Sequence, residues 1–323
     1  MARSRRLKEG SHFVIYSDAF LDVLGPDPGY ETVANVNAHE GPVYVRDWDA
    51  VLFTTLPVTT NIPSFGDRNV AIGRLDVASG KVSTFVAEAN MANGMTLDRE
   101  GRLLICEQGS HQTAARISRM NLKTKKTETV VDHWFGLPFN SPNDIVEKSD
   151  GTIWFTDPAY GALQGFRPPP LAGNFVYRYD PADDSIAVVV DTFKKPNGLC
   201  FSPDETILYV NDSGAIEGPN TYFINLPHHI RAFDVADDSH LVNERLFAVV
   251  TPVIPDGLKV DSKGRVYSSS GTGVQVFDAT GRILGEILAG GVANFCFGGV
   301  GNNMLFMMCD SAINIATLAA TGV

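Results

Sequence analysis

A short pattern occurs five times along this chain, and it constrains the fold more than any other feature. Each copy has a β-branched residue, a variable residue, a third position that is arginine in three copies, a large apolar residue, and then Asp or Asn. The copies are Ile72–Asp76, Ile117–Asn121, Val176–Asp180, Ile230–Asp234 and Val274–Asp278. Turn-forming residues follow each copy, and apolar alternation that ends at a turn is typical of a strand entering a hairpin. The chain is therefore expected to consist of hairpin units stacked against one another.

A second repeated position sets the phase of these units. Each unit begins with a polar residue, here called its anchor, which glycine usually follows. The anchors are Glu40, Asn93, Asn143, Asn197 and Asp256, with Asn294 as a weaker sixth. Each apolar run after an anchor leads into a second polar position, about 14–16 residues beyond the anchor. These second positions are Thr54, Glu107, Asp157, Asp212, Ser270 and Asp310.

The spacing of the anchors predicts an all-β fold, a six-bladed β-propeller. Most successive anchors lie about 50 residues apart, which is the length of four strands and their loops. The last unit lacks strands, since Ile313–Thr317 is a poor final copy. We expect Phe13–Tyr16 to complete it, so that pairing of N- and C-terminal strands closes the ring. A β-sandwich contains similar hairpins, but it does not repeat one register six times.

Composition is consistent with one soluble acidic domain. We expect residues 1–323 to form a single propeller, with residues 1–11 as a loose N-terminal tail. The chain has 26 Lys and Arg against 37 Asp and Glu, a net charge of −11. Its basic residues are scattered, so we expect no nucleic-acid partner. The sequence does not predict whether the protein is a monomer or a homodimer.

The predicted location is cytoplasmic. No apolar run is long enough to span a bilayer, and the basic start Met1–Lys8 is not followed by a clean apolar segment. We therefore expect no membrane association. The four cysteines all lie in apolar runs without a short paired spacing, which favours buried thiols over disulfides or a zinc site.

The anchors carry the chemistry that the sequence predicts. Equivalent positions of successive blades lie on one circle around the channel of a propeller, so the anchors should converge at one end. Glu40, Asn143, Asn197 and Asp256 supply two carboxylates and two amide carbonyls. Two negative charges balance a divalent cation, and ligation by oxygen alone suits Ca²⁺ first, then Mg²⁺ or Mn²⁺. The alternative is that Asn-Gly and Asp-Gly are only favoured turn dipeptides. That alternative explains Glu40 and Asn143-Asp144 poorly.

Several longer motifs resemble a known family. They are Glu40-Gly-Pro42, Ser141–Asp144, Gly151–Gly161, Pro196-Asn-Gly198 with Ser202-Pro-Asp204, and Pro255-Asp-Gly257. Together they make nearly the whole chain, from Glu40 to Asp310, similar to the gluconolactonase, regucalcin and senescence-marker-protein family of six-bladed propellers. The resemblance implies a divalent metal, commonly Ca²⁺, held by Glu40, Asn143, Asn197 and Asp256. It also implies hydrolysis of a lactone.

A metal at the channel mouth suits this chemistry, because a cation polarises a lactone carbonyl and stabilises the developing oxyanion. A nearby base must activate the attacking water. Asp256 is our candidate, since a ligand carboxylate can free one oxygen, and His111 is its rival on a loop that could face the same mouth. Two alternatives remain open: Asp256 could be a metal ligand only, and His111 could be a solvated surface group.

Three further residues are candidates for binding the substrate. Asn93 has the right phase to hold a substrate hydroxyl, although it could simply form a turn. The loop Ala159–Gly173 contains three consecutive prolines and is expected to act as a stiff lid placing Phe166 or Arg167 over the channel. The same loop could be a plain spacer. Asp144 could support the metal ligands, hold a second ion, or only form a turn.

The sequence thus predicts a metal-dependent lactone hydrolase, with a sugar lactone such as glucono-δ-lactone as the expected small-molecule substrate. Two alternatives stay open: a related propeller esterase acting on aryl esters or organophosphates, and a non-catalytic calcium-binding interaction protein. No G-x-S-x-G, phosphate-binding glycine loop or H-E-x-x-H is present, so serine hydrolase, nucleotide-binding and zinc protease functions lack support.

Overall fold

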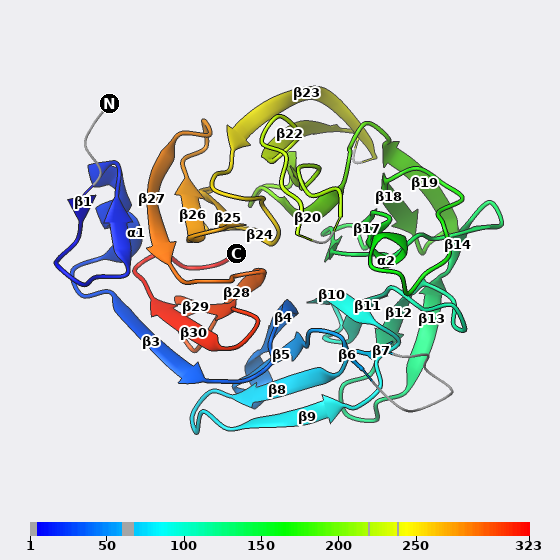
Figure 1. Ribbon diagram of the computed structural model, residues 1–323, viewed down its shortest axis with the longest axis horizontal. Coiled ribbons are helices and arrows are strands. Elements are labelled where there is room, and N and C mark those ends of the chain that lie inside the picture. Colours follow the sequence, from blue (N-terminus) through cyan, green and yellow to red (C-terminus); the bar gives the residue numbers. More distant parts are fainter. Residues whose placement is uncertain (1–4, 60–67, 219, 238) are drawn as a thin grey trace.

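Six antiparallel sheets surround a central axis, as the computed structural model shows (Figure 1). The structure describes residues 5–59, 68–218, 220–237 and 239–323. Each blade is built on four strands paired in order outward from the axis, and the innermost strand lies nearest the axis. The fold is therefore the predicted six-bladed β-propeller.

The blades follow one another along the chain. Blade 1 contains β4 (Glu40–Val45), β5 (Ala50–Thr54), β8 (Ile72–Asp76) and β9 (Val82–Val86). Blade 2 contains β10 (Ala92–Leu97), β11 (Leu103–Glu107), β12 (Arg116–Met120) and β13 (Thr127–Val131). Blade 3 contains β16 (Ile145–Glu147), β17 (Ile153–Asp157), β18 (Phe175–Asp180) and β19 (Ser185–Val190).

The second half of the ring repeats this arrangement. Blade 4 contains β20 (Pro196–Phe201), β21 (Ile207–Asp212), β22 (His229–Ala236) and β23 (His240–Val249). Blade 5 contains β24 (Leu258–Val260), β25 (Val266–Ser270), β26 (Gly273–Phe277) and β27 (Ile283–Leu288). Blade 6 contains β28 (Asn294–Gly298), β29 (Met304–Met308), β30 (Ile313–Thr317) and β3 (Gly29–Ala34).

Short elements lie between or beside the blades. They are β1 (Arg5–Arg6), β2 (Phe13–Ile15), β6 (Val58–Thr59), β7 (Arg68–Asn69), β14 (His133–Trp134), β15 (Leu137–Pro138), the helices α1 (Leu21–Leu24) and α2 (Tyr160–Leu163), and the 3₁₀ turns η1 (Asp18–Phe20) and η2 (Arg46–Trp48). None of the helices formed by the described residues is long and apolar enough to cross a membrane.

The N-terminal segment closes the ring, but with a different strand from the one we predicted. Gly29–Ala34, as β3, pairs with β30 and completes blade 6. Phe13–Ile15, as β2, instead pairs with β27 and extends blade 5. Arg5 and Arg6 pair with β2, so this part of the expected loose tail is ordered as β1, while residues 1–4 lie outside the described residues. The chain thus has two N-terminal strand-like runs, and the later one reaches blade 6.

Both repeated patterns have a fixed place in the blade. The five copies of the apolar pattern fall on the third strands, β8, β12, β18, β22 and β26. The anchors lie at the start of the innermost strands or just before them. Interleaved apolar side chains join neighbouring blades: Trp154 of blade 3 lies 5.4 Å from Phe201 of blade 4, ring centre to ring centre. This packing holds the anchors on one circle.

Candidate metal centre

The anchors meet at one end of the channel and contact one another in order around it. The backbone of Gly94 donates to the carbonyl of Asn143 at 2.7 Å, and that of Gly198 to the carbonyl of Asp256 at 3.0 Å. Asn294 Nδ2 donates to Glu40 Oε2 at 2.8 Å, which joins the last blade to the first. The six anchors are called the anchor ring below: Glu40, Asn93, Asn143, Asn197, Asp256 and Asn294.

The glycines after the anchors allow the backbones of neighbouring blades to approach each other closely. A Cβ on Gly94 would clash with the carbonyl oxygen of Asn143, and a Cβ on Gly198 would clash with that of Asp256. Both glycines lie inside strands, β10 and β20, at points where a β-bulge shifts the register. The turn-dipeptide alternative is therefore wrong at these two positions. A β-bulge bends its strand locally and changes the direction of the neighbouring side chains.

The two carboxylates of the ring are short of positive charge. Burial, the charge of Asp256 and the charge of Asp144 raise the pKa of Glu40 well above its usual value. Burial also raises the pKa of Asp256, to about 7, and the charge of Asp144 adds to this rise. The charge of His39 lowers the pKa of Glu40, but burial and the two neighbouring carboxylates outweigh it. The carboxyl groups thus lie close together inside the protein with too little positive charge among the described side chains around them. Such an arrangement favours a bound metal ion.

The amide oxygens of the ring show the same deficit. Asn143 Oδ1 and Asn93 Oδ1 are buried and have no hydrogen-bond partner among the described residues. Asn197 Nδ2 donates to Ser213 Oγ at 3.0 Å and lies 3.3 Å from the Tyr160 hydroxyl, which leaves its Oδ1 on the opposite side of the amide. A buried oxygen without a donor costs free energy unless an ion or water occupies the space.

The residues present therefore fit a hard divalent cation. Glu40, Asp256, Asn143 and Asn197 offer oxygen atoms only, which Ca²⁺, Mg²⁺ and Mn²⁺ prefer. Within the described parts of the chain no three His, Cys, Asp or Glu side chains form a metal-binding group. That result agrees with a site in which half of the ligands are amides.

The second polar positions support the anchors from behind. Asp157 accepts hydrogen bonds from the backbone of Asn140 and Ser141, at 2.9 and 2.7 Å, just before Asn143. Asp212 accepts from the backbone of Lys194 and Lys195, at 3.0 and 2.9 Å, just before Asn197. The repeated polar residue therefore fixes the segment that leads into an anchor. The sequence showed this repeated polar position but did not indicate its structural role.

Three residues at the ring were missed by sequence reasoning. Tyr160 and Ser213 hold the amide of Asn197, and burial together with the nearby charge of Asp256 raises the pKa of Tyr160. His39 precedes Glu40, and its Nδ1 lies 2.7 Å from Asp310 Oδ1. Burial lowers the pKa of His39, but Asp310 and the charge of Glu40 outweigh burial and raise it. Tyr160 lies inside the motif Gly151–Gly161 and His39 adjoins an anchor, so the sequence contained both residues without indicating their roles.

The remaining predicted site residues lie further out. His111 is exposed, and its Nε2 lies 3.3 Å from the carbonyl of Gly165. Phe166 is buried in the core between blades 1 and 2. Arg167 is buried too, and its guanidinium donates to the carbonyls of Asn140, Ser110, Thr113 and Phe139 at 2.8–3.2 Å.

These contacts correct our picture of the loop Ala159–Gly173. We expected Phe166 or Arg167 to lie over the channel, but both side chains point into the protein and fasten the loop to blades 2 and 3. The residue of this segment that does reach the ring is Tyr160, from α2. Any effect of Arg167 on the site would therefore act through the position of α2.

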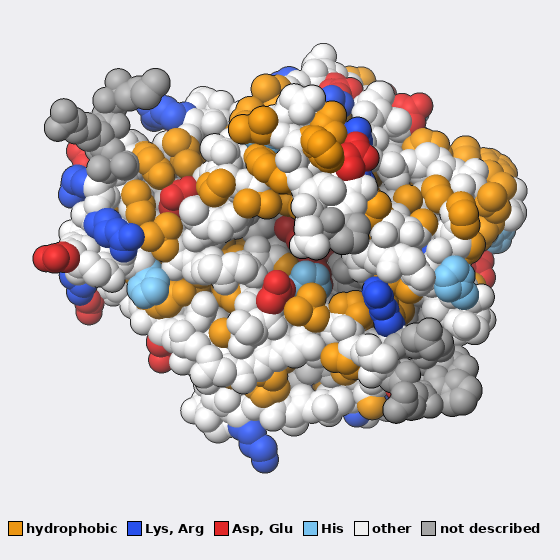
Figure 2. All heavy atoms as spheres, in the orientation of Figure 1, with side chains coloured by type: hydrophobic (Ala, Val, Ile, Leu, Met, Phe, Trp, Pro, Cys, Tyr) orange, Lys and Arg blue, Asp and Glu red, His pale blue; other side chains and the backbone are white. Residues whose placement is uncertain are grey.

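The face of the molecule in Figure 2 is hollowed near its centre, with a histidine and an acidic side chain at the border of the hollow. Residues 39–310 match the family model described as the SMP-30/gluconolactonase/LRE-like region. The chain belongs to this family. The match begins at His39 and ends at Asp310, the two residues that pair beside the ring.

Individual relatives in and around this family agree with the match. The gluconolactonase of Zymomonas mobilis is 28% identical over 317 residues, covering 93% of this chain and 83% of its own. The structure of a gluconolactonase from Xanthomonas campestris is 31% identical with a TM-score of 0.76, covering 94% of each chain. A regucalcin from Agrobacterium tumefaciens, described as calcium-binding, shares the fold with a TM-score of 0.67 at 16% identity, covering 91% of this chain and 95% of its own.

Proposed function

We propose that this protein hydrolyses a lactone at a divalent metal ion, most simply Ca²⁺, held by Glu40, Asn143, Asn197 and Asp256. A sugar lactone such as glucono-δ-lactone is the proposed substrate. The observation that carries the proposal is the buried Oδ1 of Asn143, which has no donor among the described residues. It lies in a ring with two carboxyl groups, those of Glu40 and Asp256, whose pKa values are raised because burial is not offset by enough positive charge. The gluconolactonase activity of the Zymomonas and Xanthomonas relatives supports the choice of reaction.

The bound ion would act as a Lewis acid that polarises the lactone carbonyl. The protein supplies the rest. Asp157 and Asp212 keep the segments before Asn143 and Asn197 in place, so the ligand oxygens are preorganised for the reaction. In this proposal Asn93 accepts a hydrogen bond from a substrate hydroxyl; its Oδ1 is buried and has no hydrogen-bond partner among the described residues, which supports that role.

Asp256 is the proposed proton acceptor for the attacking water. Its carboxyl group lies at the ring itself, whereas His111 is exposed on the loop beside Gly165. A base must lie within hydrogen-bond reach of the proton it removes, directly or through one water. This requirement favours Asp256, and His111 remains the rival that mutation can test.

The test uses a panel of sugar lactones, aliphatic lactones, aryl esters and organophosphates. A pH indicator measures the acid that hydrolysis of each compound releases. We expect hydrolysis of sugar lactones that is abolished by a chelator and restored by Ca²⁺, Mg²⁺ or Mn²⁺. Hydrolysis that survives complete metal removal would refute the metal mechanism. Metal binding without turnover of any compound would favour a calcium-binding protein without catalytic activity.

A further inference from the structure

A lysine occupies the channel directly below the anchor ring. Lys259 lies on β24, three residues after the anchor Asp256, and its Nζ is 3.7 Å from Oδ2 of Asp144. It lines a cavity of about 380 Å³ that the inner strands and their turns enclose. The Lys259 side chain is 29% exposed, whereas that of Asp144 is only 2% exposed.

Asp144 is the carboxylate that needs this partner. It is 2% exposed, and its Oδ1 accepts a hydrogen bond from the backbone of Ile145 at 2.9 Å. Its Oδ2 has no hydrogen-bond donor among the described residues. The charge of Asp144 also reaches the ring, since it raises the pKa of both Glu40 and Asp256. Asp144 therefore adds a third negative charge to the two ligand carboxylates.

The ionisable groups that line the cavity beside Lys259 include Glu147, Glu205, two cysteine thiols and the C-terminal Val323. Burial raises the pKa of the Cys200 and Cys296 thiols to about 12, so both are neutral at pH 7. Glu205 is bound by Ser149, and Glu147 accepts the backbone N–H of Arg99 at 2.7 Å, both at the turns. Within the described residues, Asp144 is the carboxylate that lies within ion-pair distance of Lys259, at 3.7 Å.

We propose that Lys259 is a resident cation that neutralises Asp144 and thereby reduces the negative charge around the proposed divalent ion. This inference rests on the proposed metal centre. Glu40, Asp256 and Asp144 carry three negative charges, and one divalent ion together with one ammonium group balances them. Without Lys259, the channel would hold an unpaired carboxylate next to the metal ligands.

The proposal predicts opposite effects of the two partners on metal binding. Lys259→Met removes a positive charge near the site and should tighten Ca²⁺ binding about tenfold. Asp144→Asn removes a negative charge and should weaken it by a similar factor. The double variant should return to within about twofold of the wild type. Calorimetric titration with CaCl₂ measures all four affinities, and Lys263→Met, which alters an exposed lysine on the next turn, is the matched control.

A second experiment needs no metal and separates this idea from the metal centre. In chelator, Lys259→Met should lower the midpoint of denaturant unfolding, because it leaves Asp144 charged and unpaired. Adding Asp144→Asn to that variant should recover the loss. Additive effects of the two substitutions on unfolding, or an unchanged Ca²⁺ affinity in Lys259→Met, would overturn the pairing. Absence of Ca²⁺ binding in the wild type would instead refute the metal centre. The unfolding measurements on the single and double variants in chelator would then test the pairing of Lys259 with Asp144 by themselves.

Discussion

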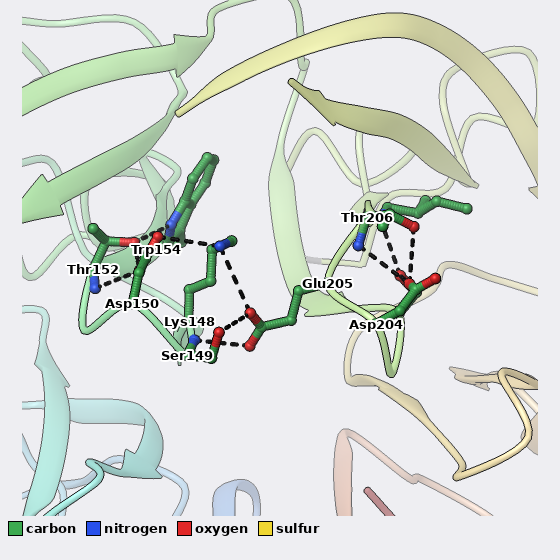
Figure 3. A network of polar contacts seen from close by, with 10 residues as sticks. Lys148, Ser149, Asp150, Thr152, Trp154, Asp204, Glu205 and Thr206 are labelled. Carbon is green, nitrogen blue, oxygen red and sulfur yellow. Dashed lines mark hydrogen bonds and ion pairs between the residues drawn. The ribbon is translucent and has the colours of Figure 1, made fainter. Parts of the chain in front are cut away.

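Carboxylates at the two ends of the inner strands differ in how many hydrogen-bond donors surround them. At the turns between the first and second strands, Asp98, Asp150, Asp204 and Asp261 each accept several hydrogen bonds. Figure 3 shows one such region, where Lys148 Nζ lies 3.1 Å from Asp150 and 3.6 Å from Glu205 of the next blade. At the anchor ring, the carboxylates crowd together, and the amide oxygens of Asn93 and Asn143 have no donor among the described residues.

The pKa values express the same contrast. Hydrogen bonds from Ser202 and Thr206 lower the pKa of Asp204 at its turn. Burial raises the pKa of Glu40 and Asp256 at the ring, where donors are too few to compensate. A carboxylate with a full set of donors stabilises the fold by itself, whereas one without them requires an external cation. The comparison thus separates Asp204 at its turn from Glu40 and Asp256 at the ring. A raised pKa is not by itself a mark of function, because burial also raises the pKa of Asp157, to about 7, although Asp157 supports the segment before Asn143.

The largest effect is expected from the ring. Glu40→Gln or Asp256→Asn removes one of the two charges that balance the ion, so metal affinity should fall steeply and lactone hydrolysis by about 10²–10³-fold. The fold should persist because apolar contacts hold the blades together. Elemental analysis and circular dichroism check both parts. Equal metal content in wild type and Glu40→Gln would contradict the ligand assignment.

The reverse result is expected at a turn. Asp98 is buried, with Arg102 Nε at 2.7 Å and Arg119 Nε at 3.0 Å. Asp98→Asn should cost about 1–3 kcal/mol of unfolding free energy, because two partly buried arginines lose the charged group between them. Denaturant unfolding measures this, and Ca²⁺ affinity should stay unchanged.

Glu100→Gln is the control for Asp98→Asn, since Glu100 also pairs with Arg102 but its side chain is 66% exposed. An exposed ion pair is worth about 1 kcal/mol or less. A Glu100→Gln variant as unstable as Asp98→Asn would mean that burial does not set the importance of the turn carboxylates.

The metal-free protein should lose stability as the pH rises. Asp256 has a folded pKa of about 7 against an ordinary value of 3.8, so the folded state holds a proton that the unfolded state has released. Stability from this group is complete below about pH 4 and is lost as the pH rises through 7, by at most about 4 kcal/mol. Unfolding in chelator from pH 4 to 8 should show the decline, and Ca²⁺ should reduce it. A decline that Ca²⁺ leaves unchanged would locate its cause outside the ring.

A smaller effect is expected from the loop. Arg167→Met removes the donors of four backbone carbonyls, each of which is then unpaired or must find water, and should cost about 1–3 kcal/mol in unfolding free energy. Relative rates across the lactone panel should also shift, because α2 and Tyr160 lose their support. Unchanged stability and unchanged relative rates would make the loop an ordinary spacer.

The smallest effect is expected from His111. If Asp256 accepts the proton, His111→Ala should change the hydrolysis rate by less than about threefold, since the loss of a general base costs about 10²–10⁴-fold. Steady-state kinetics at saturating Ca²⁺ provides the measurement. A hundredfold loss with metal retained would transfer the role of base from Asp256 to His111.

The sequence by itself determined the architecture and the composition of the ring. Six anchors in one register predicted six blades, because each blade must repeat its apolar pattern to pack against its neighbours. The same register predicted that Glu40, Asn143, Asn197 and Asp256 would lie on one circle. Local patterns suffice here because every blade solves the same packing problem.

Only the tertiary structure decided the contacts between distant segments. Phe13–Ile15 and Gly29–Ala34 have similar strand character, and the position of the ring's closing edge selected the second run for blade 6. Likewise, nothing local connects His39 with Asp310, or Lys259 with Asp144, which lie in different blades. Charge pairing and burial across the channel depend on where the ring brings its blades together, and sequence spacing does not encode those distances.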